Sequence, residues 1–243
     1  GGAMHEGLVS TRLGLKGIPA AAEEIHVARD VLLAELTGGH VHLCHMSTRG
    51  SVELIRRAKD KGLRVTAEAT PHHFALTHDR CEGYDTDAKM NPPLRESADR
   101  EAIRQGLRDG TIDCIATDHA PHHYDAKERE FDDAPNGIVG LETALGLGIR
   151  ELVATGLLTL PELIARMSTI PARLFRLVGG TLAVGAPADL VVFDPDRRWV
   201  VRRNELLSRS TNSPFIGETL TGQADLTVVA GRVVFDRASR PGM

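Results

Sequence analysis

Residues 112–123 have the sequence IDCIATDHAPHH, in which an apolar segment runs directly into an aspartate and a cluster of histidines. Ile112 and the segment 114–116 predict a short buried strand, which places Asp118 just beyond its carboxyl end. Parallel α/β folds keep their ligands and catalytic groups at that end of the strands. The segment therefore favours an active site, and the alternative interpretation is a core strand followed by a polar turn.

Two earlier segments show the same order of a strand followed by polar side chains. Residues 40–45 and 63–69 are expected to be strands, and a helix over residues 51–61 would connect them as a parallel βαβ unit. His45 ends the first strand, and the pair His72-His73 follows the second. A single histidine at a strand end is more often structural than a metal ligand. Together with Asp118, however, these histidines make three polar groups at the carboxyl edge of one sheet, which indicates a shared site.

The remaining pattern predicts further helices and then a change to short β segments. We expect a helix over residues 20–36, a helix capped by Ser97 that carries Ile103 and Leu107, and helices over residues 140–155 and 160–177. Strands are expected at residues 189–193, 199–202 and 226–235, the last with a hairpin at Ala230-Gly231. The charged loop from residue 123 to residue 137 is expected to be solvated. Two domains are predicted, residues 1–178 and a small β module over residues 179–243.

The composition excludes several classes of partner. The chain of 243 residues has a net charge of -4 and is 42% hydrophobic, and it contains no apolar run long enough to span a membrane. We therefore expect a cytoplasmic protein with a small-molecule partner, which binds neither nucleic acid nor membranes. The three cysteines cannot all pair, and Cys44 and Cys114 lie in predicted core strands, which fits reduced thiols.

The candidate site residues are suited to metal-assisted hydrolysis. An imidazole and a carboxylate can share a divalent cation, which lowers the pKa of bound water to about 7. Asp118 could accept the proton of that water and pass it to a leaving group. The sequence contains no GxSxG motif, P-loop or dinucleotide fingerprint, which disfavours a serine nucleophile and phosphate binding.

Six motifs together resemble one known family. In order they are CHMST, VTAEATPHH, KMNPPLR, IDCIATDHAPH, NGIVGLETALGL and STNSPFIGETLTG. Over nearly the whole chain, their order and spacing resemble the bacterial type I dihydroorotases of the cyclic amidohydrolase superfamily. KMNPPLR discriminates best, because the related allantoinases and dihydropyrimidinases differ in that segment. The resemblance implies an α/β fold: the C-terminal portion of a (β/α)8 metal-dependent hydrolase barrel, plus a small β-sandwich module completed by residues from a more N-terminal region.

The resemblance also implies roles for individual residues. His45 corresponds to a zinc ligand at the end of the sixth barrel strand. Asp118 corresponds to the aspartate at the end of the eighth strand, which contacts metal and carries the proton. Asn91 and His122 match substrate-contacting positions, and Asn136-Gly137 matches a dipeptide whose backbone holds the pyrimidine ring. Position 136 departs from the family, where an aromatic residue is commoner, but main-chain contacts would survive that change.

The other histidines near the motifs are expected to support the site without binding metal. They are His72, His73, His119 and His123. An imidazole in such a position can orient a ligand or donate to a carboxylate. The resemblance implies Zn2+, in a binuclear centre in the complete family members, although imidazole and carboxylate ligands also accept manganese or cobalt.

The implied activity is the reversible cyclisation of N-carbamoyl-L-aspartate to L-dihydroorotate in pyrimidine biosynthesis. Two alternatives remain: a non-catalytic dihydroorotase-like partner of aspartate transcarbamoylase, and another cyclic amidase such as allantoinase or hydantoinase. Aspartate transcarbamoylase is a candidate partner for the enzyme as well, and a homo-oligomer is expected.

The start of the sequence indicates an internal segment, because Gly1, Gly2 and Ala3 precede the first methionine, Met4. Family members carry an HxH pair, a bridging carboxylate and a further histidine on earlier strands, and these motifs have no counterpart from Gly1 onward. We therefore expect that the 243-residue chain alone has an open sheet edge, binds metal poorly and has little activity.

Overall fold

The computed structural model describes residues 1–239 and divides into two compact units. The first contains residues 1–141 and 208–214, and the second contains residues 142–207 and the described residues 215–239. The predicted domain boundary between residues 178 and 179 does not coincide with a boundary between these two units. The predicted division into domains stays a prediction. Residues 240–243, the end of the predicted β module, lie outside the described residues.

A parallel three-stranded sheet organises the first unit. Its strands are β3 (Val41–Leu43), β4 (Val65–Ala69) and β5 (Cys114–Ile115), with β4 in the middle. Glu68 of β4 pairs with Cys114 of β5, so an acidic side chain and a thiol share one level of the sheet. The predicted βαβ unit and the strand before Asp118 are confirmed, although each strand is shorter than its apolar segment.

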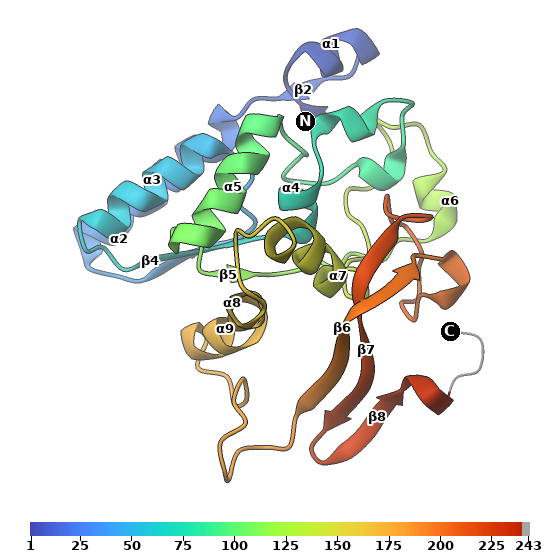
Figure 1. Ribbon diagram of the computed structural model, residues 1–243. Coiled ribbons are helices and arrows are strands. Elements are labelled where there is room, and N and C mark those ends of the chain that lie inside the picture. Colours follow the sequence, from blue (N-terminus) through green and yellow to red (C-terminus); the bar gives the residue numbers. More distant parts are fainter. Residues whose placement is uncertain (240–243) are drawn as a thin grey trace. The chain divides into compact units, whose positions relative to one another are not determined.

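The helices of this unit form where apolar residues recur at helical spacing. Helices α2 (Ala21–Thr37), α3 (Arg49–Asp60) and α5 (Ser97–Asp109) pack side by side (Figure 1). Helix α3 buries Val52, Ile55 and Ala58. The Oγ atom of Thr48 accepts a hydrogen bond from the Ser51 amide at 3.1 Å, which explains why the helix begins before the predicted residue 51.

The cap of α5 differs by one residue from the prediction. Ser97 is the first helical residue, and Glu96 occupies the cap position. Asp99 stabilises this start, because its Oδ2 accepts from the Glu96 amide at 3.3 Å and its Oδ1 accepts from the Arg49 amide at 2.9 Å. The predicted core positions Ile103 and Leu107 are fully buried.

Shorter elements complete the first unit. They are β1 (Met4–His5), α1 (Leu8–Leu13), β2 (Gly17–Ile18), α4 (Pro71–Ala75), two short 3-10 turns η1 (His78–Cys81) and η2 (Thr86–Ala88), and α6 (Tyr124–Lys127). No helix in residues 1–239 is both long and apolar enough to cross a membrane.

Two further expectations for the first unit were wrong. Cys44 is exposed, because β3 ends at Leu43 and the thiol lies beyond the sheet. The charged loop from residue 123 to residue 137 is not simply solvated, because Lys127 and Phe131 are buried. The three cysteines of the described chain form no disulfide.

The second unit contains two longer helical segments, the 3-10 turns η5 (Arg203–Glu205) and η6 (Arg237–Ser239), and an antiparallel sheet. The helical segments run as α7 (Ala144–Gly148) with η3 (Ile149–Val153), and α8 (Leu160–Ile164) with η4 (Ala165–Thr169) and α9 (Ile170–Leu174). Both predicted helices are therefore present, each with a π-helical turn at η3 or η4. Leu147, Leu152 and Leu163 are fully buried in this unit.

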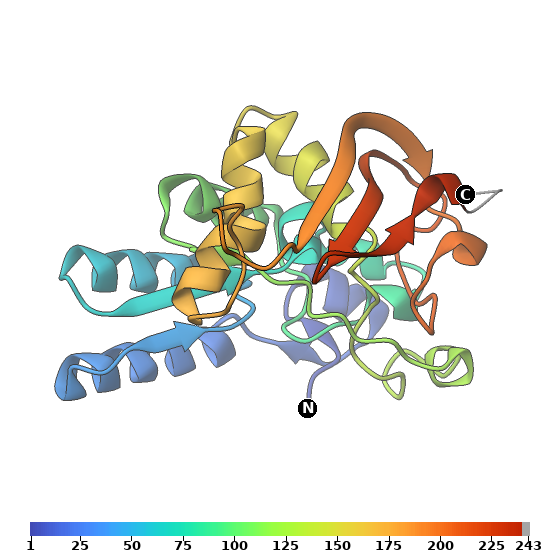
Figure 2. The same cartoon turned by 90° about the horizontal axis from the view of Figure 1, so that it is seen from below.

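The sheet joins β6 (Leu190–Val200), β7 (Thr219–Val229) and β8 (Arg232–Asp236) in sequence order (Figure 2). The predicted strands at 189–193 and 199–202 are one strand, because β6 continues through a bulge between Asp194 and Arg198. The predicted hairpin is confirmed. Ala230 and Gly231 have φ values of 49° and 75°, as a tight two-residue turn requires.

Candidate metal and substrate site

His45 and Asp118 occupy corresponding places beyond the carboxyl ends of β3 and β5. Their φ values are 60° and 49°, in the left-handed region that residues other than glycine seldom adopt. Non-glycine residues held in this conformation cluster at functional sites. The two side chains face each other, with His45 Nε2 3.7 Å from Asp118 Oδ1.

A buried carboxylate, Glu68, lies behind His45. Its Oε1 lies 2.9 Å from His45 Nδ1, although the imidazole is not aligned for a linear hydrogen bond. Its Oε2 lies 3.2 Å from His42 Nε2. Burial by itself raises the pKa of Glu68, but the interactions with His42 and His45 outweigh this effect and hold the pKa at about 2. Glu68 is therefore an anion that favours a proton on His45 Nδ1.

The sequence interpretation missed Glu68 and His42 as parts of this site. One signal was available, since an acidic residue in the middle of the strand VTAEA must either face solvent or have a partner. The sequence could not identify that partner, because His42 lies 26 positions earlier in the chain.

Asp118 has properties suited to a proton acceptor. Burial raises the pKa of its carboxyl group, nearby Glu68 raises it further, and His45 opposes the shift. The pKa of His45 is also raised, through its interaction with Glu68, while burial opposes this and Asp118 adds to it. Each group therefore holds a proton more readily than it would in water.

The facing atoms of His45 and Asp118 are compatible with a shared divalent cation. Imidazole nitrogen and carboxylate oxygen bind zinc at about 2.0–2.2 Å, which at a tetrahedral angle places two ligands of one ion roughly 3.3–3.6 Å apart. The 3.7 Å separation is close to this range. With Nδ1 directed at Glu68, the Nε2 lone pair of His45 is directed at the gap, the arrangement found where a carboxylate supports a metal-binding histidine.

A second group of ligand atoms lies next to this gap. Atoms of His42, Glu68 and Cys114 all lie within 4.8 Å of one another. Both oxygens of Glu68 already face imidazoles, Oε2 in a hydrogen bond with His42 and Oε1 in a close charge contact with His45, so these two contacts account for the carboxylate in this cluster.

His72 and His73 lie on α4 and are buried. His73 contacts Thr70 Oγ at 2.8 Å and the Pro92 carbonyl at 2.9 Å. Burial lowers the pKa of His73 to about 4 and that of His72 well below its ordinary value. Both imidazoles are therefore neutral near pH 7. Their expected supporting role stays a prediction.

The predicted substrate-contacting residues fall into two places. Asn91 lines an open pocket of about 500 Å³, together with His42, Cys44 and Arg95. His42 therefore belongs both to this pocket and to the Glu68 cluster. His122 lies instead beside the dipeptide 136–137, with its Nε2 2.8 Å from the carbonyl oxygen of Asn136.

The dipeptide 136–137 is held by close packing. Gly137 has a φ of 116°, and a Cβ atom at this position would lie 2.6 Å from the Cβ of Ala120. Lys127 donates from Nζ to the carbonyl oxygens of Pro135 and Gly137 at 3.0 and 3.1 Å. The backbone at this position is therefore fixed, while the Asn136 side chain is exposed.

His119 and His123 have local structural roles. His119 Nδ1 accepts a hydrogen bond from the Gly140 amide at 3.1 Å. His123 caps α6, with its Nδ1 accepting from the Asp125 amide at 3.3 Å.

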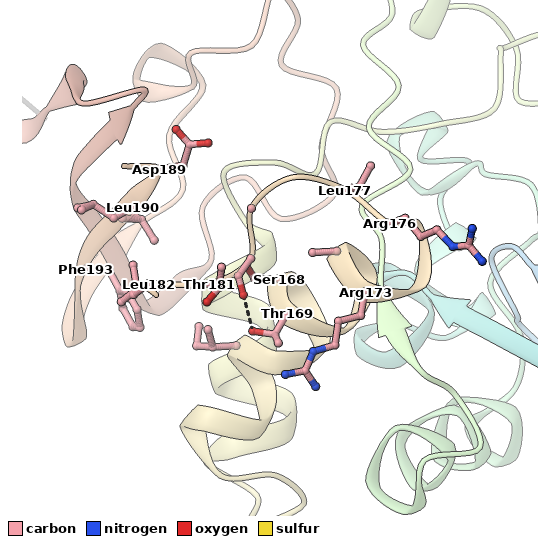
Figure 3. A pocket seen from close by; sticks show the side chains of 15 residues that line it. Ser168, Thr169, Arg173, Arg176, Leu177, Thr181, Leu182, Asp189, Leu190 and Phe193 are labelled. Atoms are coloured by element: carbon pink, nitrogen blue, oxygen red, sulfur yellow. Dashed lines mark hydrogen bonds between the residues drawn. The ribbon is translucent and has the colours of Figure 1, made fainter. Parts of the chain in front are cut away.

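A pocket with a volume of about 890 Å³ lies in the second unit (Figure 3). It is lined by Arg173, Arg176, Asp189 and mostly apolar side chains, and Thr169 Oγ donates to the Gly180 carbonyl at its wall. None of its lining residues is a histidine or cysteine. The site of His45, Glu68 and Asp118 in the first unit is therefore the better candidate for metal-dependent chemistry.

Residues 3–234 match the sequence model of the Amidohydrolase family, so the chain belongs to that family. Its fold is accordingly that of an α/β metal-dependent hydrolase. The chain is 56% identical over 236 residues to the dihydroorotase of Pelobacter propionicus, covering 97% of this chain and 55% of that protein. It is 54% identical to the dihydroorotase of Geobacter metallireducens, with the same coverage. The resemblance drawn from the six motifs is confirmed.

Solved structures agree with this assignment. A D-hydantoinase from a Thermus species superposes with a TM-score of 0.84 at 29% identity, covering 90% of this chain and 49% of that one. The L-hydantoinase of Arthrobacter aurescens gives a TM-score of 0.82 at 33% identity, covering 88% of this chain and 49% of that one. The chain spans about half the length of the relatives it matches.

Proposed function

We propose that the protein containing this sequence is a dihydroorotase, which interconverts N-carbamoyl-L-aspartate and L-dihydroorotate. The observation that carries the proposal is the pair His45 and Asp118, whose side chains face each other across 3.7 Å in a chain 52–56% identical to curated dihydroorotases. The finer architecture belongs to the same proposal: the later strands of a (β/α)8 barrel and part of a β-sandwich module.

His45 and Asp118 would hold the cation, with zinc as the expected metal. A divalent cation at this place supplies Lewis acidity, which lowers the pKa of water and polarises a carbonyl oxygen. Glu68 keeps the Nδ1 proton of His45 in place and so orients Nε2. Asn91, His122 and the backbone of Asn136 and Gly137 would bind the substrate.

Asp118 would move the proton in both directions of the reaction. In hydrolysis, the oxygen of water bonds to the ring carbonyl carbon, and the carboxylate of Asp118 accepts the proton that this water loses. The bond between that carbon and the ring nitrogen then breaks, and Asp118 returns the proton to the nitrogen. Cyclisation reverses these steps and releases one water molecule.

The test is to assay the whole protein that contains this sequence, because the 243-residue chain alone is expected to have little activity. Dihydroorotate hydrolysis and the reverse cyclisation are measured with the variants Asp118→Asn and Asp60→Asn. Loss of a general base typically costs 10²–10⁴-fold in rate, so Asp118→Asn should lower kcat by roughly that factor. Asp60 is exposed at the end of α3, and its variant should retain the wild-type rate. A wild-type protein that acts on neither substrate would refute the proposal.

A second candidate substrate class is supported by the solved structures that superpose on this chain, several of which are hydantoinases. Their identity of 26–33% is well below that of the dihydroorotases. Turnover of hydantoin or allantoin with no turnover of dihydroorotate would favour this alternative. Association with aspartate transcarbamoylase and a homo-oligomeric state remain predictions.

A further inference from the structure

The motif STNSP has no role in the proposed mechanism, yet one of its residues connects the two loops that carry the substrate-contacting groups. Residues 208–214 belong to the first compact unit, although the chain before and after them belongs to the second. Asn212, in the middle of this segment, is only 4% exposed. A buried amide needs hydrogen-bond partners, and all three that Asn212 finds lie in these two loops.

The side chain of Asn212 makes three hydrogen bonds. Its Oδ1 accepts from the amide of His122 at 3.1 Å. Its Nδ2 donates to the carbonyl oxygens of Ala120 and Gly137, each at 3.0 Å. Two carbonyl oxygens require a donor and one N–H group requires an acceptor, so the surroundings determine which way the amide points.

The main chain of Asn212 makes an independent connection. Its carbonyl oxygen accepts from the Val139 amide at 2.9 Å. Removing the side chain therefore leaves the segment attached to the residues after Gly137 and removes the bridge that Asn212 makes between the two loops. The direct contacts between the loops stay, namely the Ala120 amide bonded to the Ile138 carbonyl oxygen and His122 Nε2 beside the Asn136 carbonyl oxygen, each at 2.8 Å.

We propose that Asn212 is a positioning residue that sets the spacing between His122 and Gly137. This inference rests on the proposed function, because those two residues are expected to contact the substrate. Asn212 touches neither the substrate nor the reacting atoms in this scheme. It acts on the binding geometry, so its loss should weaken substrate binding more than it slows the chemical step.

Two variants separate the individual hydrogen bonds. Asn212→Asp has nearly the same shape and keeps an acceptor for the His122 amide, but it cannot donate to Ala120 or Gly137. Asn212→Ala removes all three hydrogen bonds. Asn204→Ala, an exposed asparagine of the second unit, is the matched control.

The first measurement is amide hydrogen exchange resolved to single residues, which does not require activity. In Asn212→Ala the His122 amide should exchange at least roughly 10-fold faster, because it loses its acceptor. In Asn212→Asp the His122 amide should stay protected, while the Gly137 amide should exchange faster as its loop loosens. The Val139 amide, bonded to the main chain of residue 212, should change least in both variants.

The second measurement is steady-state kinetics with dihydroorotate. Both variants should raise KM by roughly 10-fold and change kcat by less than about 3-fold. Equal acceleration of all these amides, or unchanged exchange at His122 in Asn212→Ala, would overturn the inference. The inference would also be overturned if Asn212→Ala and Asn212→Asp showed faster amide exchange in the loops but a wild-type KM. Failure of the proposed function is a separate result, in which the wild-type protein does not act on dihydroorotate but the exchange pattern is still observed.

Discussion

At the residue scale, Glu68 has the largest effect on the chemistry of the site. Its two oxygens face the imidazoles of His42 and His45, and both contacts are partly buried. Thr66 Oγ lies 2.9 Å from the other ring nitrogen of His42 and so limits the rotation of that imidazole. The orientation of His45 toward Asp118 thus depends on a carboxylate on the neighbouring strand.

Replacing Glu68 by glutamine should weaken metal binding while the fold is retained. Glutamine has the same shape but no charge, so it can no longer hold His45 with its Nδ1 protonated and Nε2 directed at Asp118. Loss of such a supporting group typically costs 10–100-fold in metal affinity, and we expect roughly that range. Zinc titration of the purified protein, monitored by competition with a chelating dye, measures the change.

Glu53→Gln is the control for this variant, because Glu53 is a partly exposed ion-pair residue on α3. Its zinc affinity should equal that of the wild type. A zinc affinity of Glu68→Gln equal to that of the wild type would show that His45 is oriented without the Glu68 carboxylate.

At the element scale, two buried lysines hold the loop that ends in Asn136 and Gly137. Lys89 donates to the carbonyl oxygens of Asp132 and Ala134 at 2.9 and 2.7 Å. Lys127 donates to the carbonyl oxygens of Pro135 and Gly137. A loop that composition alone predicts to be solvated is therefore held in place by ammonium groups bonded to its backbone.

Gly137→Ala should disrupt this loop by a steric clash. The added Cβ would lie 2.6 Å from the Cβ of Ala120, and the φ of 116° is strained for alanine. We expect a destabilisation of about 1–3 kcal/mol, measured by chemical denaturation, together with a higher KM for dihydroorotate.

Gly179→Ala separates the two causes. Gly179 has a similar φ of 129°, but no atom lies within 4 Å of the position that an added Cβ would take, so only the backbone strain is introduced. A destabilisation as large as that of Gly137→Ala would contradict a steric role for Ala120.

At the scale of the whole molecule, the buried lysines make stability depend on pH. Burial lowers the pKa of Lys127 from 10.5 to about 8. Below pH 8 both the folded and the unfolded chain hold this proton, and above pH 10.5 neither does. Between these values the unfolded chain binds more protons, so the contribution of Lys127 to the free energy of unfolding rises with pH.

Lys127→Met should therefore flatten the pH dependence of stability between pH 8 and 10.5. A shift from 10.5 to about 8 corresponds to a change on the order of 3 kcal/mol across this window. Denaturant unfolding at several pH values measures the difference between the variant and the wild type. Lys16→Met, at an exposed position, should follow the wild-type curve, and parallel curves for Lys127→Met would disprove the assignment.

The sequence by itself determined the local elements and the order of the chemical groups. Helical spacing of apolar residues predicts α2, α3 and α5, and the apolar segment before Asp118 predicts β5, because these signals depend only on near neighbours. The six motifs were enough to indicate the family. Cap positions and the bulge in β6 were missed, since they depend on a few hydrogen bonds that composition does not specify.

Only the tertiary structure decided how the candidate site is supported. The contact of His42 with Glu68 joins residues 26 positions apart, and that of His122 with Asn212 joins residues 90 positions apart. Pairing over such distances depends on the register of parallel strands and on the path of loops between them, which no local pattern encodes. Buried polar groups must find partners, but the folded chain alone determines which partners are within reach.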